Sequence, residues 1–423
     1  MAGFQPPRGT HDLLPPESER FVQLERLADE IFGAAGYGRI ITPMFEDSAL
    51  FDRGIGEAND VVSKETYRFT DRGGNDLTLR PEGTAPVMRA IVSNHMWDAG
   101  LPVKVRYAAA MFRYERPQKG RVRQHHQVGL EAVGSEAPAL DAEVISLCHR
   151  FLTDARVGEV TLLVNSMGHD ECRAAYRHVF VEAISAQRSE LSEDSQRRLE
   201  KNPLRIWDSK DPADRAILTD APRLPDHLCD PCAGHLAQVR RYLDEFEIGY
   251  EMSPGLVRGF DYYTRTTFEF QSRALDAAQN AVGGGGRYDG LVASIGGPSL
   301  PGIGFGIGLE RVLLAQQAAG TDDATFAVDC FVVGLREEDI PLAMAFARQV
   351  RADGLSSDIA YSTRGLKAQM KHADRIGAHT VALIGAEEAA SGSVTLRDMA
   401  TGEQETIPVR EAVQRLKERG TPR

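Results

Sequence analysis

The sequence has little cysteine and no long apolar run. Five cysteines among 423 residues are too few for the dense disulfide framework of small secreted domains. No stretch reaches the roughly 18 consecutive apolar residues that a membrane-spanning helix needs. The first residues also lack the basic-then-apolar order of a signal peptide. These absences argue against a membrane or secreted protein, so we expect a cytoplasmic one with no membrane partner.

Basic residues are also in the minority. Lys and Arg number 49 against 61 Asp and Glu, a formal net charge of −12, which excludes a general nucleic-acid coat. The balance reverses locally after Met111, where the charged residues up to His125 are Arg113, Glu115, Arg116, Lys119, Arg121 and Arg123. Such a reversal indicates an anionic ligand, although a solvated basic hairpin would have the same composition.

Length and periodicity predict a mixed α/β protein with more than one domain. Residues 1–320 contain an amphipathic helix over Phe21–Ala35, a short apolar strand in GRIITPMFED, and further strands and helices. A charge-rich, mainly helical stretch at about 169–251 lies between two strand-like segments and reads as an insertion. Residues 326–423 alternate short strands with helices, the pattern of a small, mostly parallel α/β domain.

Three segments combine arginine, carboxylate and glycine. FRYERPQKGR carries Arg113 and Glu115 on a predicted strand, whose two-residue period places both side chains on one face. LVRGFDYYTRTTFEF carries Arg258 ahead of a tyrosine pair. GIGFGIGLERVLL alternates glycines before Arg311, so its backbone can approach a flat ligand or pack against a neighbouring strand. Taken one at a time, each segment is also compatible with a purely structural role.

The order of these segments resembles that of the class II aminoacyl-tRNA synthetases. GYGRIITPMFED is similar to motif 1 of that family, MFRYERPQKGRVRQHHQ to motif 2, and GIGFGIGLERVLL to motif 3. LVRGFDYYTRTTFEF and GGGGRYDGL resemble the two signatures of the histidyl branch, and the resemblance covers essentially the whole chain. It implies an antiparallel catalytic sheet flanked by helices over residues 1–320, with the helical insertion, and a C-terminal anticodon-binding α/β domain over 326–423.

The resemblance also implies a histidine site. Acceptors for the substrate's amino group are expected from Glu82, Thr84 and Gln127. The imidazole is expected to be read by Glu131 and Tyr263, with Tyr262 beside them.

The same resemblance implies an ATP site with two catalytic arginines. Arg258 is expected on the substrate carboxylate and the α-phosphate, and Arg113 on the α-phosphate. Arg121 and Arg311 are expected on the outer phosphates or the adenine. His125 stands where the family often has a phenylalanine stacked on adenine, so that contact differs in this chain.

The activity implied is ligation of histidine to tRNA. ATP would first activate histidine as an adenylate, with Mg²⁺ accompanying the ATP phosphates. The 3′-terminal hydroxyl of the histidine tRNA would then accept the amino acid. A homodimer is also implied, since motif 1, including the helix Phe21–Ala35, forms the dimer surface in the family. The apolar face of that helix has no obvious partner within its own segment.

The cysteines leave one question open. Cys148 and Cys330 lie in apolar surroundings and are expected in the core, and Cys172 receives no role. HLCDPCAGH offers four potential zinc ligands: His227, Cys229, Cys232 and His235. Their spacing is tighter than that of the usual two-pair arrangement. A helix start with partly buried cysteines is the favoured reading, so the sequence predicts no metal site.

Two other functions compete with ligation. A synthetase-like regulatory subunit that senses histidine without charging tRNA would tend to lose the arginines and the C-terminal domain. An ATP-dependent ligase for another small substrate should lack the tyrosine pair and that domain. Here Arg113, Arg258 and Arg311 are all present, and an α/β module follows them.

Overall fold

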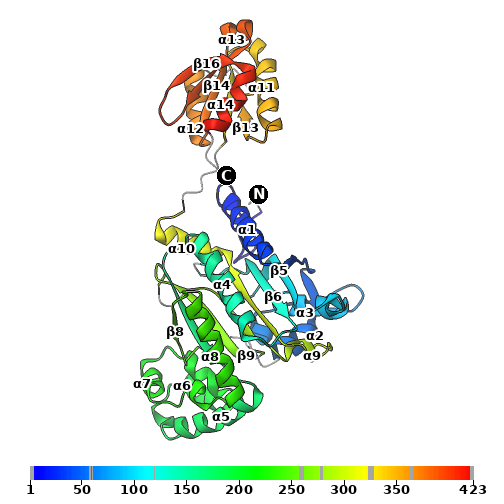
Figure 1. Ribbon diagram of the computed structural model, residues 1–423, viewed down its shortest axis with the longest axis vertical. Helices are drawn as coiled ribbons and strands as arrows, with labels where there is room; N and C mark the ends of the chain where they lie inside the picture. The colour runs from blue at the N-terminus through cyan, green and yellow to red at the C-terminus, as the bar shows by residue number, and fades with distance from the viewer. Residues whose placement is uncertain are drawn as a thin grey trace. The chain divides into compact units, whose positions relative to one another are not determined.

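The computed structural model describes residues 4–56, 59, 61–118, 120–256, 262–276, 280–322, 328–361 and 365–419 (Figure 1). The chain forms two compact units, one mainly of Arg20–Asp322 and the other mainly of Asp323–Arg423. No helix within the described ranges is long and apolar enough to cross a membrane.

The first unit is built on a large, mainly antiparallel sheet. Antiparallel pairing runs through its centre, and β1 and β8 pair in parallel with their neighbours at the two edges. The strand order is β1 (Gly38–Arg39), β5 (Val103–Phe112), β6 (Gln124–Val133), β11 (Gly302–Gly308), β10 (Ala281–Arg287), β9 (Thr264–Ser272), β7 (Val160–Ser166) and β8 (Tyr250–Met252). The antiparallel core predicted from the sequence is confirmed.

Strand alternation gives this sheet two different faces. On β6, β9 and β11, residues such as Leu130, Phe268 and Phe305 point to one side and form the main core. Four helices contribute to that core: α1 (Glu17–Ala34), α4 (Pro138–Asp154), α8 (Asp230–Glu245) and α10 (Leu309–Ala319). Figure 1 shows α4 and α8 side by side along this face. Cys148 on α4 is fully buried there, as predicted.

The opposite face is only partly covered by apolar residues. A smaller core joins α3 (Thr84–Ser93) and α9 (Leu291–Ser294) to one end of β5 and β6. A second sheet lies in this region, with strands β2 (Phe45–Asp47), β4 (Asp76–Leu79) and β3 (Tyr67–Thr70). Short helical turns accompany it: α2 (Ser48–Phe51), η1 (Asp52–Gly56), η2 (Val61–Glu65) and η3 (Met96–Ala99). The rest of this face carries glycine and polar side chains.

A helical subdomain separates β7 from β8. It has its own core around Tyr176, Phe180 and Ile206. Its elements, which precede α8, are α5 (Asp170–Ser185), η4 (Arg188–Glu190), α6 (Glu193–Lys201), η5 (Pro203–Asp208), α7 (Pro212–Thr219) and η6 (Leu224–His227). Figure 1 shows these helices gathered beyond one end of α8.

The second unit is an α/β domain with a five-stranded sheet. The strand order is β13 (Ser357–Ile359), β12 (Cys330–Gly334), β14 (Thr380–Ile384), β15 (Ser393–Asp398) and β16 (Gln404–Pro408). The first three strands are parallel, and β15 and β16 form an antiparallel hairpin. Its helical elements are η7 (Glu337–Asp339), α11 (Ile340–Ala352), α12 (Leu366–Arg375), α13 (Ala386–Ser391) and α14 (Val409–Arg419). Cys330 is fully buried, as expected.

Three local expectations need correction. The strand expected in GRIITPMFED is reduced to β1 and β2, because residues 40–44 between them make no continuous ladder. Arg113 and Glu115 lie beyond the end of β5, in the loop rather than on the strand. The apolar face of α1, with Phe21 and Phe32, packs into the core of its own unit, so this face is covered within the chain.

Candidate active site

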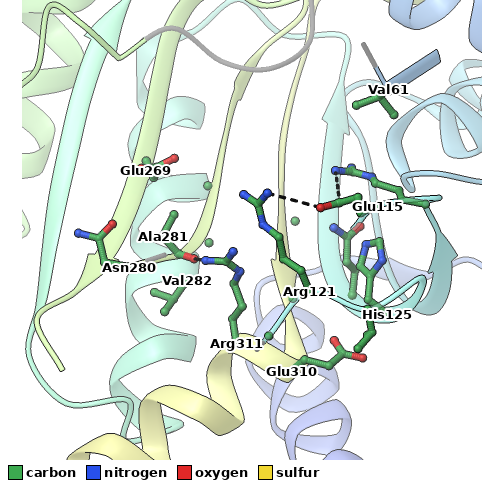
Figure 2. A pocket seen from close by; sticks show the side chains of 18 of the residues that line it. Val61, Glu115, Arg121, His125, Glu269, Asn280, Ala281, Val282, Glu310 and Arg311 are labelled. Atoms are coloured by element: carbon green, nitrogen blue, oxygen red, sulfur yellow. Dashed lines mark hydrogen bonds and ion pairs between the residues drawn. The ribbon is translucent and has the colours of Figure 1, made fainter. Parts of the chain in front are cut away.

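A polar cavity of about 630 Å³ lies on the glycine-bearing face of the large sheet (Figure 2). Its floor comes from β6, β9, β10 and β11, where strand alternation turns polar or glycine positions away from the main core. The charged or imidazole side chains on its wall are Glu65, Arg113, Glu115, Arg121, His125, Arg205, Lys210, Glu269, Glu310 and Arg311.

Three arginines that the sequence predicted as ATP contacts meet in this cavity. Arg113 Nε donates to the carbonyl of Pro81 at 2.8 Å. Arg121 Nη1 lies 3.5 Å from a Glu115 carboxylate oxygen, and Arg311 Nη1 donates to the carbonyl of Ala281 at 3.0 Å. Figure 2 shows the guanidinium groups of Arg121 and Arg311 extending into the same space. Several guanidinium groups around one cavity form a site for a polyanion.

Two adjacent histidines at the start of β6 behave differently. Burial and the positive charge of Arg113 lower the pKa of His125 to about 3, so its ring is neutral at physiological pH. A neutral ring on the cavity wall can stack on a flat ligand. His126 instead lies with Nδ1 3.0 Å from Glu310, whose carboxylate also accepts the His126 backbone N–H at 2.9 Å. Glu310 therefore joins the start of α10 to β6.

A pair of buried carboxylates lies next to the cavity. Glu82 accepts the backbone N–H groups of Thr84 and Ala85 at 2.6 and 2.8 Å, which satisfies donors at the start of α3. Glu131 has no exposed surface and accepts a hydrogen bond from Thr84 Oγ1 at 2.8 Å. Burial raises the pKa of both carboxyls. Both groups keep acceptor capacity for a cationic or N–H-bearing ligand.

Tyr107, Tyr262 and Tyr288 interact with Glu131, and Tyr263 lies beside Tyr262. Tyr288 donates its hydroxyl to the Glu131 carboxylate. The ring of Tyr262 lies between Tyr288 and Tyr263, with centroid distances of 5.8 and 4.8 Å respectively. Burial, followed by the charge of Glu131, raises the pKa of Tyr107 and of Tyr288, so both phenols stay protonated. The pocket therefore combines carboxylates with neutral aromatic hydroxyls.

The alternating glycines of β11 make this pocket possible. A Cβ atom on Gly302 would lie 2.2 Å from the ring of Tyr288, and one on Gly304 would lie 1.8 Å from Glu131 Oε2. Gly306 and Gly308 instead line the cavity. One half of the glycine strand therefore leaves room for the side chains of Tyr288 and Glu131, and the other half faces the cavity.

Gln127 connects the cavity with the tyrosine pocket. It lines the cavity beside Arg113, and it shares a face of β6 with Glu131 because the two are separated by an even number of residues. A Cβ atom on Gly306 would lie 3.6 Å from Gln127 Oε1 and 3.7 Å from the Tyr107 hydroxyl. The anion-binding and carboxylate-tyrosine regions therefore adjoin across this residue.

The raised pKa of Glu131 predicts a pH-dependent stability. Its pKa rises from 4.5 to about 8 because burial disfavours the charged form. The folded state then holds this proton over a range where the unfolded chain releases it, so the free energy of unfolding should fall as pH rises through that range. Glu131→Gln removes the titration and should show a smaller fall between about pH 5 and about pH 9. Urea unfolding of both proteins measures the difference.

Glu30→Gln, at an exposed carboxylate of α1, is the matched control and should follow the wild type. If the free energy of unfolding fell equally with pH in the wild type and in Glu131→Gln, the raised pKa of Glu131 would be contradicted.

Most site residues predicted from the sequence lie in these two adjoining regions. Arg113, Arg121, His125, Gln127 and Arg311 line the cavity. Glu82, Thr84, Glu131, Tyr262 and Tyr263 belong to the carboxylate-tyrosine pocket, where charge and hydrogen-bond interactions link them. Arg258 lies outside the described residues, so its assignment rests on the resemblance.

Several residues of the site escaped the sequence reasoning. Tyr107 and Tyr288 contribute hydroxyls beside Glu131, and Glu269, Arg205 and Lys210 line the cavity. Tyr288 stands in the quoted segment GGGGRYDGL, which was a usable signal. Arg205 and Lys210 belong to the insertion, and no local pattern connects them to a site on the sheet.

The same GGGGRYDGL segment also anchors the sheet. Arg287 and Asp141 are both fully buried and pair at 2.6 Å. Arg287 further donates to the carbonyl of Ser135 at 3.0 Å, and Thr266 Oγ1 donates to Asp141 at 2.6 Å. A buried guanidinium is tolerated here because each side of the pair has additional hydrogen bonds.

The candidate zinc ligands do not stay together. His235 is buried with Nε2 3.4 Å from Asp141, and the ring of His227 packs near Tyr176 at a centroid distance of 5.8 Å. Cys229 and Cys232 instead lie beside His169 and Cys172. The four potential ligands weighed from the sequence therefore do not form one cluster, because helix α8 turns His235 toward the sheet and away from the cysteines.

Comparison with known proteins finds relatives of both units. The family model described as histidyl-tRNA synthetase matches residues 9–312, and the one described as anticodon binding domain matches residues 329–419. The histidine–tRNA ligase of Rhodococcus erythropolis is 47% identical over 98% of this chain and 97% of its own length. That of Streptomyces coelicolor is 46% identical over 99% and 98%.

Among solved structures, apo histidyl-tRNA synthetase of S. aureus matches with a TM-score of 0.80 at 35% identity, covering 98% of this chain and 100% of that one. Sequence and fold agree over both units, and the chain belongs to the histidyl-tRNA synthetase family.

Proposed function

We propose that this chain is a histidine–tRNA ligase that uses ATP to join histidine to the 3′ end of the histidine tRNA. The observation that carries the proposal is an arginine-lined cavity beside a buried cluster of carboxylates and tyrosines, with Gln127 on the cavity wall and close to the Gly306 backbone and the Tyr107 side of that cluster. A polyanion and a small cationic amino acid can therefore occupy adjacent positions. Full-length relatives with this activity support the same conclusion.

The carboxylate-tyrosine pocket suits histidine. Glu82, Thr84 and Gln127 supply oxygen acceptors for the α-ammonium group, which has three donors and no acceptor. Glu131 and Tyr263, with Tyr262 beside them, are proposed to contact the two distinct ring nitrogens. Glu131 has two hydroxyl partners already, Thr84 and Tyr288, which hold its carboxylate in one orientation. A pocket with such buried polar groups rejects an analogue that leaves them unpaired.

The arginine-lined cavity suits ATP. Arg113 and Arg258 are proposed to bind the α-phosphate, with Arg258 also on the histidine carboxylate. Arg121 and Arg311 would hold the outer phosphates or the adenine, against which the neutral ring of His125 can stack. In the first step a histidine carboxylate oxygen bonds to the α-phosphorus while the bond to pyrophosphate breaks. Fixed guanidinium groups stabilise the charge that develops on the phosphoryl oxygens.

The cavity also fits the magnesium ion that accompanies ATP. Glu115 and Glu269 lie on its wall and provide carboxylate oxygens, the ligands that Mg²⁺ prefers, and they would hold an ion that also binds the phosphates. Bound there, Mg²⁺ supplies neutralisation of phosphate charge.

The tRNA is proposed to contact both units. In the second step the terminal ribose hydroxyl of tRNA takes the histidyl group from the adenylate and AMP leaves. The second unit is proposed to contact the anticodon, and its family match supports this. A cytoplasmic location is proposed, since tRNA charging is part of protein synthesis.

A homodimer is proposed through the segment that follows α1. Ile41, Met44 and Phe45 are 85%, 55% and 50% exposed, an apolar surface close to edge strand β1. Ile41→Asp should weaken dimerisation by about tenfold or more, because each such side chain contributes about 1.5–3 kcal/mol when buried. Sedimentation at micromolar concentration measures this. Leu342→Asp, at an exposed leucine of the second unit, is the control. A monomeric wild type would contradict the proposal.

Two assays separate ligation from the regulatory alternative. Histidine-dependent exchange of pyrophosphate into ATP measures the first step, and charging of purified tRNA measures the second. A ligase performs both, whereas a histidine-sensing regulatory subunit charges no tRNA. A ligase for another substrate would show exchange that does not depend on histidine.

A further inference from the structure

A cluster of metal-binding side chains lies outside the active site, at the base of the helical insertion. It consists of His169, Cys172, Cys229 and Cys232, and one potential ligand atom of each lies within 4.8 Å of the others. We propose that these four residues bind one zinc ion, which fixes the insertion to the catalytic sheet.

Two helix starts bring the four ligands together. His169 and Cys229 occupy the positions just before α5 and α8, and Cys172 and Cys232 follow three residues later in the first turns. Each pair therefore spans a helix N-terminus, where the partial positive charge of the backbone favours thiolates. Gly168, with a φ of +60°, allows the tight entry to α5, where a Cβ atom would lie 2.6 Å from Cys172 Cβ.

The two distances from His169 Nδ1 to sulfur lie close to those of a tetrahedral site. His169 Nδ1 lies 3.4 Å from Cys232 Sγ and 3.9 Å from Cys229 Sγ. Zinc–sulfur bonds of about 2.3 Å and zinc–nitrogen bonds of about 2.0–2.1 Å place tetrahedral ligands about 3.5–3.8 Å apart. All four ligand atoms lie within 4.8 Å of one another, so small side-chain rotations would bring them onto one ion.

The hydrogen bonds around the cluster orient its ligands. With Nδ1 toward the sulfurs, His169 has Nε2 3.2 Å from the carboxylate of Glu171, the usual outer partner of a metal-binding histidine. Cys172 Sγ accepts the backbone N–H of Cys229 at 3.3 Å, a bond that strengthens when the sulfur is a thiolate. The start of α8 therefore supports a ligand that belongs to α5, and the first turn of α5 orients its own histidine.

The ligand set selects zinc by its chemistry. Three sulfurs and one imidazole are soft or borderline ligands, and no carboxylate belongs to the cluster, so Mg²⁺ and Ca²⁺ are disfavoured. Four protein ligands leave no open position, which indicates a structural rather than a catalytic ion.

The position of the cluster gives the ion a structural role. α5 leaves β7 and α8 leads back to β8, so an ion between their starts closes the base of the insertion. Arg173, next to Cys172, donates to the backbone carbonyl of Tyr263 at 2.9 Å. The ion would thereby help hold a tyrosine of the histidine pocket. This last step rests on the proposed function, whereas zinc binding does not.

Metal content tests the site without reference to activity. The full-length chain is purified under reducing conditions, stripped with a chelator, reconstituted with Zn²⁺, desalted and analysed for zinc. We expect about one zinc per chain. His169→Ala and Cys232→Ser should retain less than about a tenth of that, because losing one of four ligands opens the site. His169→Cys preserves four ligands and should retain zinc.

His227→Ala is the matched control, since this exposed neighbour lies outside the cluster, and it should keep full zinc content. Reconstitution of the wild type with Co²⁺ adds a test that requires no variant, because tetrahedral cobalt with thiolate ligands absorbs visible light. A wild type that retains no zinc would overturn the proposal. A colourless cobalt protein would overturn it as well, and so would zinc retention by Cys232→Ser equal to that of the wild type.

The positional role has a separate readout. Metal-free protein should show a higher KM for histidine in pyrophosphate exchange, with less change in the KM for ATP. Equal KM values with and without zinc would overturn the link to Tyr263 while leaving the metal site intact. A protein that binds zinc but shows no histidine-dependent exchange would contradict the proposed function alone.

Discussion

Arg113→Ala is expected to lower the kcat of histidine-dependent pyrophosphate exchange by about 10²–10³, the cost of losing one fixed donor to a developing oxyanion. Arg113 lies on the cavity wall, where its Nε donates to the Pro81 carbonyl and its Nη1 lies 3.9 Å from a Glu115 carboxylate oxygen, so its guanidinium is held in place beside the cavity. Because its charge acts mainly on the transition state, kcat should fall more than KM rises. Arg258→Ala should have an effect of the same size if both arginines act on the α-phosphate.

Arg116→Ala provides the matched control. It removes a basic residue of the same loop that is exposed and does not line the cavity, so exchange should stay within about twofold of wild type. Circular dichroism and melting temperature establish that each variant folds. If Arg113→Ala kept exchange within a few-fold of wild type, its catalytic assignment would be wrong.

Removing the second unit should separate the two half-reactions. A chain ending at Asp322 should keep measurable histidine-dependent exchange but lose charging of tRNA by about 10²-fold or more, since contacts to unpaired bases are worth about 1–3 kcal/mol each. The described residues that we propose to contact histidine and ATP all lie in the first unit. Base contacts in an unpaired loop would come from the second unit. The quantity to measure is the ratio of the two activities.

The position of the cut matters for this experiment. Gly320 ends α10 in a left-handed conformation, and Thr321 Oγ1 donates to the Arg156 carbonyl at 2.6 Å, so a cut at Ala319 would disturb the first unit. Ending the chain at Asp322 preserves both features. An equal loss of exchange and charging in a soluble, folded truncation would remove the second unit from tRNA recognition.

A full-length variant serves as a further control. Lys367→Glu combined with Lys371→Glu reverses two exposed charges on α12 without removing the unit. Charging should become weaker and more sensitive to salt, because phosphate contacts are electrostatic, while exchange stays unchanged. Unchanged charging would assign tRNA contacts to another face of the unit.

Elements with a strong local period were predictable. Apolar residues repeat along α4 and along β12 and β14, and these elements form close to where the period indicates. The short helix α13 escaped because six residues carry too little periodicity. The apolar residues Ile41 and Met44 were assigned to a strand, but they are exposed beside the sheet edge, where no ladder continues. Hydrophobicity alone does not distinguish a buried strand from an apolar surface.

The metal ligands show where local reasoning fails. From the sequence, Cys229 and Cys232 were weighed together with the nearby His227 and His235, and no metal site was predicted. The partners lie on another helix start, at His169 and Cys172, and only the return of α8 to the sheet beside α5 brings them close. A contact between segments so distant in the chain leaves no trace in the spacing of either.

The order of the motifs along the chain was enough to predict the family, and the resemblance implied the antiparallel catalytic core; the α/β pattern of the tail could be predicted from its own residues, because such patterns are local. The described residues that the resemblance named for the site lie in the cavity or in the buried cluster beside it. The protonation of Glu131 and His125, the hydroxyls of Tyr107 and Tyr288, and the room that Gly304 leaves for Glu131 came only from the fold. Burial, close packing and the distances between charges depend on residues that are neighbours in space. These residues are far apart in the sequence and come together only in the folded sheet.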